Sequence, residues 1–297
     1  MSDKPILVTG ATGAQGKALS KILLQRGVPV RAMTRNPAKP TAKQLAALGA
    51  EVVAGDLDDE ESLNQACAGM YGVFALQNFW EKGVGFQREV DQGCKLARAA
   101  KQAGVEHFLQ TSVAGCDNAA GVQHFQSKWA IEQYVDEIGL PRTFLREVFF
   151  MENFFEPVMG GSGKKAINPA LVISVLQGCL NKDTSLHMVT VDDIAWFAAE
   201  IFSKPDQYLG KTLDIASDSL TVAQMKAAWR KVSGKRPLPV GLPAWALRLV
   251  NAEAARQYDW NNRTGWHFDL EPLREIKPDL TRFEDFLSHR LKDAENA

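Results

Sequence analysis

His124 and Lys128 stand four residues apart in the stretch HFQSKWAIEQY. If this stretch is helical, the two side chains lie on one face, one turn apart. An imidazole, whose ordinary pKa is about 6.5, can donate a proton near neutral pH, and an ammonium group can hold the hydroxyls of a bound ligand. The two residues therefore have the chemistry of a catalytic pair. The alternative is that they are two side chains on the solvated face of an ordinary helix.

A glycine-rich turn follows the first apolar stretch of the chain, where TGATGAQGKAL has the spacing G-x-x-G-x-x-G. Glycine permits a tight turn and lets backbone approach a phosphate closely, and the start of the next helix supplies oriented N–H groups. The spacing alone is a weak signal, but its place between a first strand and a first helix is typical of dinucleotide binding. The sequence therefore predicts a dinucleotide site, and the alternative is a glycine turn needed only for packing.

The residue that follows the second apolar stretch indicates which dinucleotide is preferred. An NAD site usually carries Asp or Glu about 20 residues after the glycines, where it binds the ribose hydroxyls. Here Arg35 stands nineteen residues after Gly16, with Lys39 as a possible second cation. A guanidinium can grip a 2′-phosphate, which a carboxylate would repel. We therefore expect a preference for NADP(H) over NAD(H), unless Arg35 is only a solvated loop charge.

The third apolar stretch ends in GDLDD, residues 55–59. A carboxylate of Asp56 could accept a hydrogen bond from the adenine amino group, and Leu57 could cover the ring. The alternative is that Asp56 caps the next helix, a role that Asp58 or Asp59 fits even better.

The elements that must position these residues alternate regularly in the first half of the chain. Short, apolar, β-branched runs occur at residues 5–10, 28–34, 51–56, 72–77, 107–113 and 142–148. Segments with helical spacing lie between them, at 14–26, 37–48, 59–68, 86–103 and 124–138, and Gly27, Gly49, Gly104 and Gly139 stand just after four of these. Apolar strands separated by helices predict a parallel sheet covered on both faces. The fold class is therefore α/β, a doubly wound parallel sheet of the Rossmann type.

The second half of the chain has a different pattern, which predicts a smaller, partly interleaved region on the substrate side. We assign residues 1–150 to a dinucleotide-binding domain, to which 183–216 return with a helix near 192–203 and a strand near 211–216. Residues 151–182 and 217–297 form the smaller region, in which Ser219 or Thr221 could cap a helix. The segment GGSGKK, residues 160–165, fails the pattern of a phosphate-binding loop and is interpreted as a mobile loop beside the pocket.

The overall composition excludes several classes of protein. The net charge of 34 − 35 = −1 is a poor start for a nucleic-acid binder, so direct nucleic-acid binding is not expected. The four cysteines are scattered without a C-x-x-C pair, and no metal site is predicted. The chain has no signal-peptide pattern at its start and no apolar run near the ~20 residues of a membrane span, so we expect a cytoplasmic protein. The sequence carries no signal for its oligomeric state.

These pieces together resemble the NmrA-like branch of the atypical short-chain dehydrogenases/reductases. The resemblance covers about residues 4–215 and rests on VTGATGAQG, TRNP, GDLDD, QNFWE, HFQSK, REVFFMENF and VTVDDIAWFAAEIF. It implies an NADP(H)-binding protein whose cofactor lies along the carboxyl ends of the strands. The branch includes redox-sensing co-regulators without established chemistry and NADPH-dependent reductases of quinones and dyes.

Matched motif by motif, the resemblance implies a set of cofactor contacts in this chain. The pyrophosphate falls on the glycine turn, that is Gly10, Ala11, Thr12, Gly13, Ala14, Gln15 and Gly16, and the 2′-phosphate falls on Arg35. Adenine lies beside Asp56 and Leu57, and the nicotinamide end lies near Gln77, Asn78, Phe79, Phe150 and Asn153. For the two phenylalanines, simple core packing is an equally good interpretation.

Reductases of the wider superfamily use a Tyr-x-x-x-Lys pair, which this chain lacks. No tyrosine of the chain has a lysine four residues later, and His124 with Lys128 stand at the expected place. Lys128 can still hold the nicotinamide ribose. His124 either replaces the missing acid or does no chemistry, and we favour the second reading. Thr111 and Ser112, at the end of the fifth strand, stand where these reductases often keep a substrate-polarising hydroxyl.

Two functions are compatible with this pattern. The first is an NADPH-dependent reductase of a small quinone-like or conjugated acceptor, which needs little help from a positioned acid because its charge delocalises. The second is a non-catalytic sensor that binds a regulatory protein according to the redox state of NADP(H). A lost tyrosine is tolerable in the first and expected in the second, and we favour the first.

Overall fold

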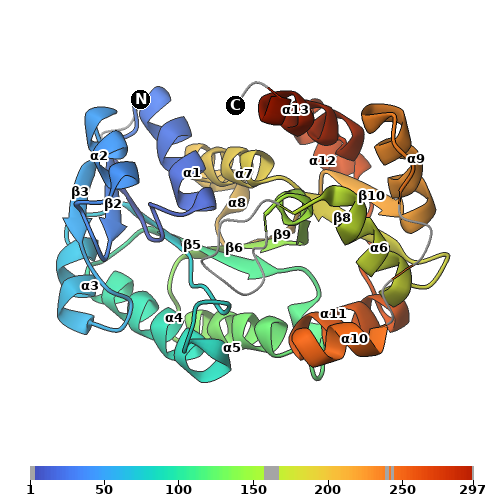
Figure 1. The fold of residues 1–297 in the computed structure, drawn as a ribbon. Coiled ribbons are helices and arrows are strands. Elements are labelled where there is room, and N and C mark those ends of the chain that lie inside the picture. Colours follow the sequence, from blue (N-terminus) through green and yellow to red (C-terminus); the bar gives the residue numbers. More distant parts are fainter. Residues whose placement is uncertain (1–3, 157–166, 238–240, 242–243, 296–297) are drawn as a thin grey trace.

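The computed structural model describes residues 4–156, 167–237, 241 and 244–295, and its centre is a parallel sheet with helices on both faces (Figure 1). The strand order is β3-β2-β1-β4-β5-β6-β9, with every pairing parallel. The strands are β1 (Ile6–Val8), β2 (Val30–Thr34), β3 (Glu51–Ala54), β4 (Gly72–Ala75), β5 (His107–Val113), β6 (Arg142–Glu147) and β9 (Thr212–Asp214). The predicted fold class is confirmed. The strand order runs outward in one direction from β1 to β3 and in the other direction from β4, so the switch point lies between β1 and β4, where such sheets bind ligands.

The connecting helices lie where the sequence predicts them. They are α1 (Ala14–Gln25), α2 (Pro40–Ala47), α3 (Glu60–Cys67), α4 (Gly85–Gln102) and α5 (Gln123–Glu137). Helix α1 packs with α7 (Val191–Ser203) on one face of the sheet, and α4 packs with α5 on the other (Figure 1). Each of the four glycines predicted to end a helix has a positive φ, namely Gly27, Gly49, Gly104 and Gly139.

A second, smaller sheet of three strands adjoins the first. It contains β7 (Phe149–Phe150), β8 (Ser185–Val189) and β10 (Asp218–Thr221), in the order β10-β8-β7. The predicted strand near 211–216 is β9, and it pairs with β6 in the main sheet. The sequence predicts that the whole stretch 183–216 returns to the dinucleotide-binding domain. Its first strand, β8, pairs in the smaller sheet and not in the main one. The remaining assignment of residues to two domains stays a prediction.

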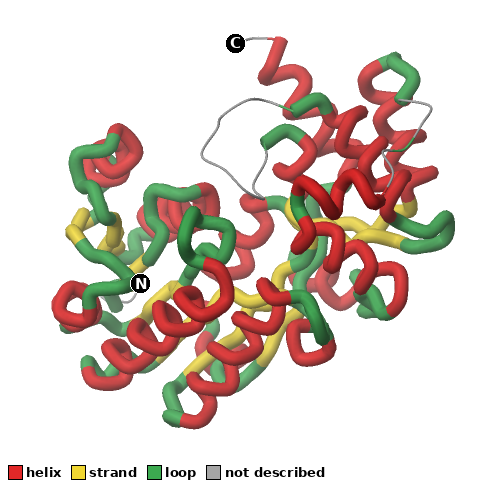
Figure 2. The backbone as a smooth tube through the Cα atoms, turned by 60° about the horizontal axis from the view of Figure 1, so that its bottom comes forward, coloured by secondary structure: helices red, strands yellow, loops and turns green. Residues whose placement is uncertain are grey.

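The C-terminal helices gather at one end of the molecule, beyond the strands of the main sheet (Figure 2). They are α9 (Val222–Ser233), α10 (Ala244–Val250), α11 (Ala252–Arg263), α12 (Glu271–Ile276) and α13 (Phe283–Glu295); α6 (Pro169–Cys179) lies with them, and α8 (Pro205–Tyr208) follows α7. Of the two predicted caps, Thr221 begins α9 with a capping box, whereas Ser219 lies in β10. The segment GGSGKK lies outside the described residues. No helix in the described ranges combines the length and apolar character needed to cross a bilayer.

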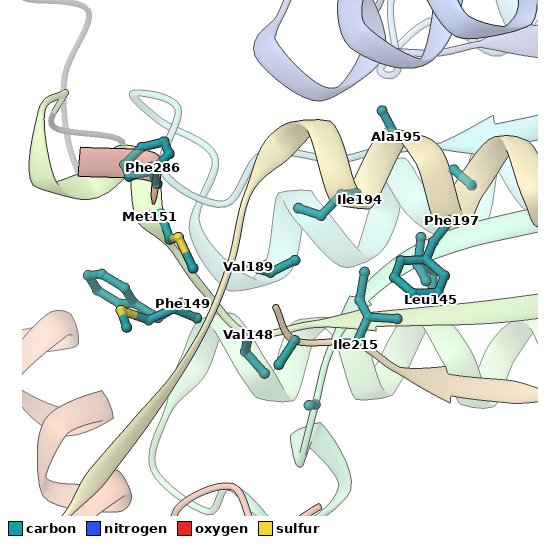
Figure 3. Close-up of a cluster of buried hydrophobic side chains, with 14 of the residues drawn as sticks. Leu145, Val148, Phe149, Met151, Val189, Ile194, Ala195, Phe197, Ile215 and Phe286 are labelled. Atoms are coloured by element: carbon teal, nitrogen blue, oxygen red, sulfur yellow. The ribbon is translucent and has the colours of Figure 1, made fainter. Parts of the chain in front are cut away.

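A continuous hydrophobic cluster joins the two sheets, from Ile6 in β1 to Leu287 in α13. Figure 3 shows the part where they meet, with Leu145 of β6, Phe149 of β7 and Val189 of β8 among the buried side chains. A second cluster lies under α3, α4 and α5 on the other face of the main sheet. Because one core is shared, the smaller sheet and the C-terminal helices are held against the carboxyl edge of β6.

A buried ion pair attaches α5, the helix that carries His124 and Lys128, to strand β6. Arg146 donates through Nε and Nη2 to the two carboxylate oxygens of Glu132, at 3.0 and 2.7 Å. The Glu132 side chain is 1% exposed and that of Arg146 is 11% exposed. A charge taken this far out of water is stable only with its partner in place.

We therefore expect Glu132→Gln to lower the free energy of unfolding by about 3 kcal/mol, because the guanidinium loses its buried counter-charge and is left with the carboxylate of Asp117, which lies 3.1 Å away and is 44% exposed. Urea denaturation followed by circular dichroism measures this loss. Asp136→Asn is the matched control, since Asp136 and Arg142 pair across the same two elements with the Asp136 side chain 52% exposed. That variant should lose about 1 kcal/mol or less. Equal losses in the two variants would contradict the account.

Candidate cofactor and catalytic site

The residues singled out in the sequence gather along the carboxyl edge of the main sheet. The glycine turn follows β1, and the strands that flank β1 are β2, which leads to Arg35, and β4, which leads to Gln77. Helix α5 lies behind β5 and β6 and carries His124 and Lys128. In open α/β sheets this edge is where ligands bind.

The turn after β1 can close only with glycine at two of its positions. Gly10 has a φ of +59°, and its carbonyl accepts a hydrogen bond of 2.9 Å from the Gly13 N–H. A Cβ atom on Gly16 would lie 2.4 Å from the Gly10 oxygen, so no other residue fits there. Gly13 is the N-cap of α1, with no side chain closing the helix end. The first N–H groups of α1 are therefore available to an anion.

Arg35 lies just beyond β2 and forms an ion pair of 2.5 Å with Glu81, from the segment after β4. The pair joins the loops on the two sides of the glycine turn, since β1 lies between β2 and β4. The hydrogen bond with Glu81 raises the pKa of Arg35, with a further contribution from the charge of Asp56. Arg35 remains 56% exposed. Lys39 is exposed at the start of α2 and makes no ion pair with the part of the chain that the structure describes.

The carboxylates of GDLDD have separate partners. Asp59 is the N-cap of α3 and accepts from two backbone N–H groups of its first turn. Asp58 binds Arg88, which lowers the pKa of its carboxyl. The Asp56 carboxylate accepts from the Asp58 N–H at 3.1 Å, and Leu57 packs on the edge of the second hydrophobic cluster. Asp59, and not Asp56, therefore caps α3, and Asp56 is half-buried with its charge near Arg35. The predicted contact of Asp56 with adenine stays a prediction.

Lys128 is buried and paired. Its Nζ lies 2.9 Å from Glu89 Oε1, and it donates to the backbone carbonyl of Gln77 at 3.2 Å. Glu89 is fully buried in α4, and its other oxygen accepts from Ser127. The alternative of a solvated helix lysine is therefore wrong for Lys128, which is 8% exposed. The ammonium group is fixed at the end of β4.

His124 lies one turn before Lys128 and is also buried. Glu253 of α11 accepts through one oxygen from both the backbone N–H and the ring Nδ1 of His124, at 2.9 and 2.7 Å. The ring centroids of Phe79 and Trp80 lie 5.7 and 4.9 Å from the centroid of the imidazole. His124 is therefore not on a solvated helix face either, and a residue from the C-terminal helices determines how its ring is oriented.

Glu147, at the end of β6, lies next to the glycine turn. It accepts a hydrogen bond of 2.9 Å from Gln15 Nε2, and its other oxygen is buried without a partner among the described residues. Burial raises the pKa of Glu147 to about 8, although Lys128 and Gln15 act in the opposite direction. At neutral pH Glu147 is therefore a neutral carboxylic acid in the wall of the site.

Buried polar atoms without partners cluster around the same edge. Within the described ranges they include Gln15 Oε1, Gln77 Nε2 and Glu147 Oε1, together with Asn153 Oδ1 in the short helix η2 (Met151–Phe154). Such atoms normally find a hydrogen-bonding partner. A dinucleotide carries both donors and acceptors, so these atoms and the glycine-only turn fit that ligand.

The other predicted residues contribute less distinctly. Asn78 is exposed and its side chain accepts from the Trp80 N–H, which shapes the segment after β4. Phe150 is half-buried against the main hydrophobic cluster. Thr111 donates to the carbonyl of Ala75 within the sheet. Ser112 lies 3.7 Å from a cysteine sulfur and is buried, as Thr111 is.

Sequence reasoning missed four carboxylates of this edge, namely Glu81, Glu89, Glu147 and Glu253. Glu81 and Glu147 lie inside motifs that the sequence singled out, so a search there for partners of Arg35 and Lys128 could have found them. Glu89 lies on a helix with ordinary amphipathic spacing, and Glu253 is 129 residues away from His124. No local pattern marks either of these two.

The neutral state of Glu147 has a consequence for stability. The folded protein keeps this proton up to pH about 8, whereas the unfolded chain releases it near the ordinary value of 4.5. The stability linked to this group is therefore fully present below pH about 4.5 and falls as the pH rises towards 8. Glu147→Gln removes the titration.

We expect the free energy of unfolding of Glu147→Gln to exceed that of the wild type increasingly between pH 5 and 8, reaching a few kcal/mol, since one pKa unit corresponds to about 1.4 kcal/mol. Urea denaturation at pH 5, 6.5 and 8 measures the difference. Glu106→Gln, at an exposed position, is the control and should show no such trend. A difference that stays constant with pH would show that Glu147 is ionised in the folded protein.

Comparison with known proteins agrees with this architecture. The family model of the NmrA-like family matches residues 2–254. A relative from Malbranchea aurantiaca, the NmrA-like family domain-containing oxidoreductase malD, is 30% identical over 271 residues, which is 85% of this chain and 80% of the relative.

Two solved structures have the same fold. The NADPH-dependent quinone oxidoreductase QOR2 from Escherichia coli aligns over 96% of this chain and 99% of its own, with a TM-score of 0.76 and 24% identity. The triphenylmethane reductase of Citrobacter sp., complexed with NADP(H), aligns over 95% and 98%, with a TM-score of 0.75 and 22% identity. The family match spans most of the chain, and the chain therefore belongs to the NmrA-like family.

Proposed function

We propose that the protein binds NADP(H) and is a reductase that delivers hydride to a quinone-like or conjugated small-molecule acceptor. The observation that carries this proposal is Lys128, a buried ammonium that Glu89 holds at the carboxyl end of β4, on the edge of the sheet where ligands bind. The functions of its relatives support it, since they include an oxidoreductase, a quinone oxidoreductase and a triphenylmethane reductase with bound NADP(H).

In this proposal the cofactor extends along the carboxyl edge of the sheet. The pyrophosphate binds the glycine turn between Gly10 and Gly16, and the 2′-phosphate binds Arg35, with Lys39 nearby. Adenine lies beside Asp56 and Leu57. The nicotinamide end lies near Gln77, Asn78, Phe79, Phe150 and Asn153.

The bound nicotinamide would supply the hydride, and the residues of this chain would fix where it is delivered. Lys128 donates to the ribose hydroxyls, and its position is maintained by Glu89. Gln77 Nε2 and Gln15 Oε1 offer a donor and an acceptor to the polar groups of the ligand. Because Glu147 is neutral at pH 7, it places no negative charge beside the pyrophosphate. Positioning of this kind supplies much of the rate enhancement of an enzyme.

The preference for NADPH is expected to depend on both members of the Arg35–Glu81 pair. Arg35→Ala should weaken NADPH binding about 10-fold or more and leave NADH binding unchanged, because only the 2′-phosphate needs the guanidinium. Glu81→Gln should strengthen NADPH binding up to about 5-fold, since the phosphate no longer competes with an exposed ion pair of about 1 kcal/mol or less. Isothermal titration calorimetry with both nucleotides measures these changes. Equal affinities for NADPH and NADH in the wild type would contradict the assignment.

Turnover itself is tested by following NADPH absorbance with a panel of quinones and enals. The wild type should oxidise NADPH with at least one acceptor. The double variant Glu89→Gln, Lys128→Met should lose about 100-fold in kcat/KM relative to the wild type, because the ribose is no longer held. The double variant avoids leaving a buried charge without its partner.

Lys43→Met, at an exposed position of α2, is the control for loss of a lysine. Tight NADPH binding by the wild type without turnover of any acceptor would contradict the reductase. It would favour the regulator that senses NADP(H).

A further inference from the structure

His124 and Lys128 face the same segment of the chain. Lys128 donates to the carbonyl of Gln77, and the imidazole of His124 packs on Phe79 and Trp80, two and three residues further along. The two residues are about one helical turn apart, about 6 Å along α5. The imidazole is therefore adjacent to the position proposed for the nicotinamide ribose.

Glu253 holds this imidazole by two hydrogen bonds from the same residue. One carboxylate oxygen accepts from the His124 N–H at 2.9 Å and from Nδ1 at 2.7 Å, and the other oxygen accepts from Arg256 at 2.9 Å. The side chains of His124 and Glu253 are 8% and 11% exposed. Two bonds to one oxygen fix the rotation of the ring as well as the position of the helix.

The arrangement also determines which nitrogen is left for another partner. Although burial alone would raise the pKa of Glu253, its hydrogen bonds with His124 lower it, so it is ionised at neutral pH. An ionised carboxylate can only accept, and Nδ1 therefore carries a proton. No hydrogen bond to Nε2 comes from the described residues. Nε2 is therefore the ring nitrogen left to face a ligand.

We propose that Glu253 is a positioning residue that holds His124 with Nε2 directed to the acceptor, so that the imidazolium supplies the proton of the reduction. This inference rests on the proposed reductase function. The acceptor takes up a hydride from the reduced cofactor and a proton from Nε2. The N–H bond breaks, an O–H bond forms on the acceptor, and the electron pair of the broken bond stays on Nε2. Solvent water then returns the proton.

The charged groups around the imidazole are few. Glu253 contacts it from α11, Arg256 reaches it only through Glu253, and Lys128 lies one turn along α5. From the segment after β4, the rings of Phe79 and Trp80 pack on the imidazole. A change in the charge of Glu253 should therefore dominate any change in the pH dependence of proton donation by His124.

Glu253→Gln separates charge from geometry, because an amide oxygen can still accept from both N–H groups. With a soluble naphthoquinone that the wild type reduces, this variant should lose about 10-fold or more in kcat, and its pH–kcat profile should move to lower pH because a negative charge beside the imidazole is removed. Its NADPH affinity should stay within about 2-fold of the wild type, since the residue does not contact the cofactor. Glu271→Gln is the matched control, because Glu271 forms an equivalent pair with Arg274 on α12.

The double-mutant cycle with His124→Gln distinguishes positioning from a purely structural role. If Glu253 acts through His124, the variant Glu253→Gln, His124→Gln should be no slower than His124→Gln alone. A Glu253→Gln variant with the kcat and pH profile of the wild type would overturn the inference while leaving the reductase intact. A wild type that reduces no acceptor would overturn the proposed function itself, and the inference with it.

Discussion

The ion pair between Lys128 and Glu89 is the contact on which the rest of the site depends. Both groups are removed from water, and neither is stable there without the other. Glu89 belongs to α4 and Lys128 belongs to α5. The backbone carbonyl of Gln77, which also accepts from the ammonium group, lies just after β4. The pair thus joins two helices and a strand at the place where a parallel sheet meets its ligand.

Two further carboxylates attach α5 on its other sides. Glu132 binds Arg146 of β6 in a buried bidentate pair, and Glu253 of α11 holds the first turn of the helix at His124. The helix is therefore tied to the sheet, to its neighbour and to the C-terminal helices. Its polar face cannot rotate without breaking a buried charged contact. This explains how a short helix can present two functional side chains with fixed orientation.

The fold was predictable because its signals are local. Apolar runs, the glycines that end helices and the glycine turn each depend on a few adjacent residues, and they gave the order of β1 to β6 with their helices. The smaller sheet was missed because β7 has two residues and β10 leads straight into a helix. Within the site, the glycine turn, Arg35 and Lys128 carried local motifs. The carboxylates that contact these side chains come from distant parts of the sequence. Glu253, for example, is 129 residues from His124, and no spacing rule reveals such a contact.

The central claim, that Lys128 marks the nicotinamide end of an NADP(H) site, is tested most directly by a crystal structure of the protein with NADP⁺. The expected structure has Lys128 Nζ within hydrogen-bonding distance of the nicotinamide ribose hydroxyls. Arg35 should lie on the 2′-phosphate, with its contact to Glu81 broken. A nucleotide bound with its ribose away from Lys128, and with the Arg35–Glu81 pair intact, would contradict the account.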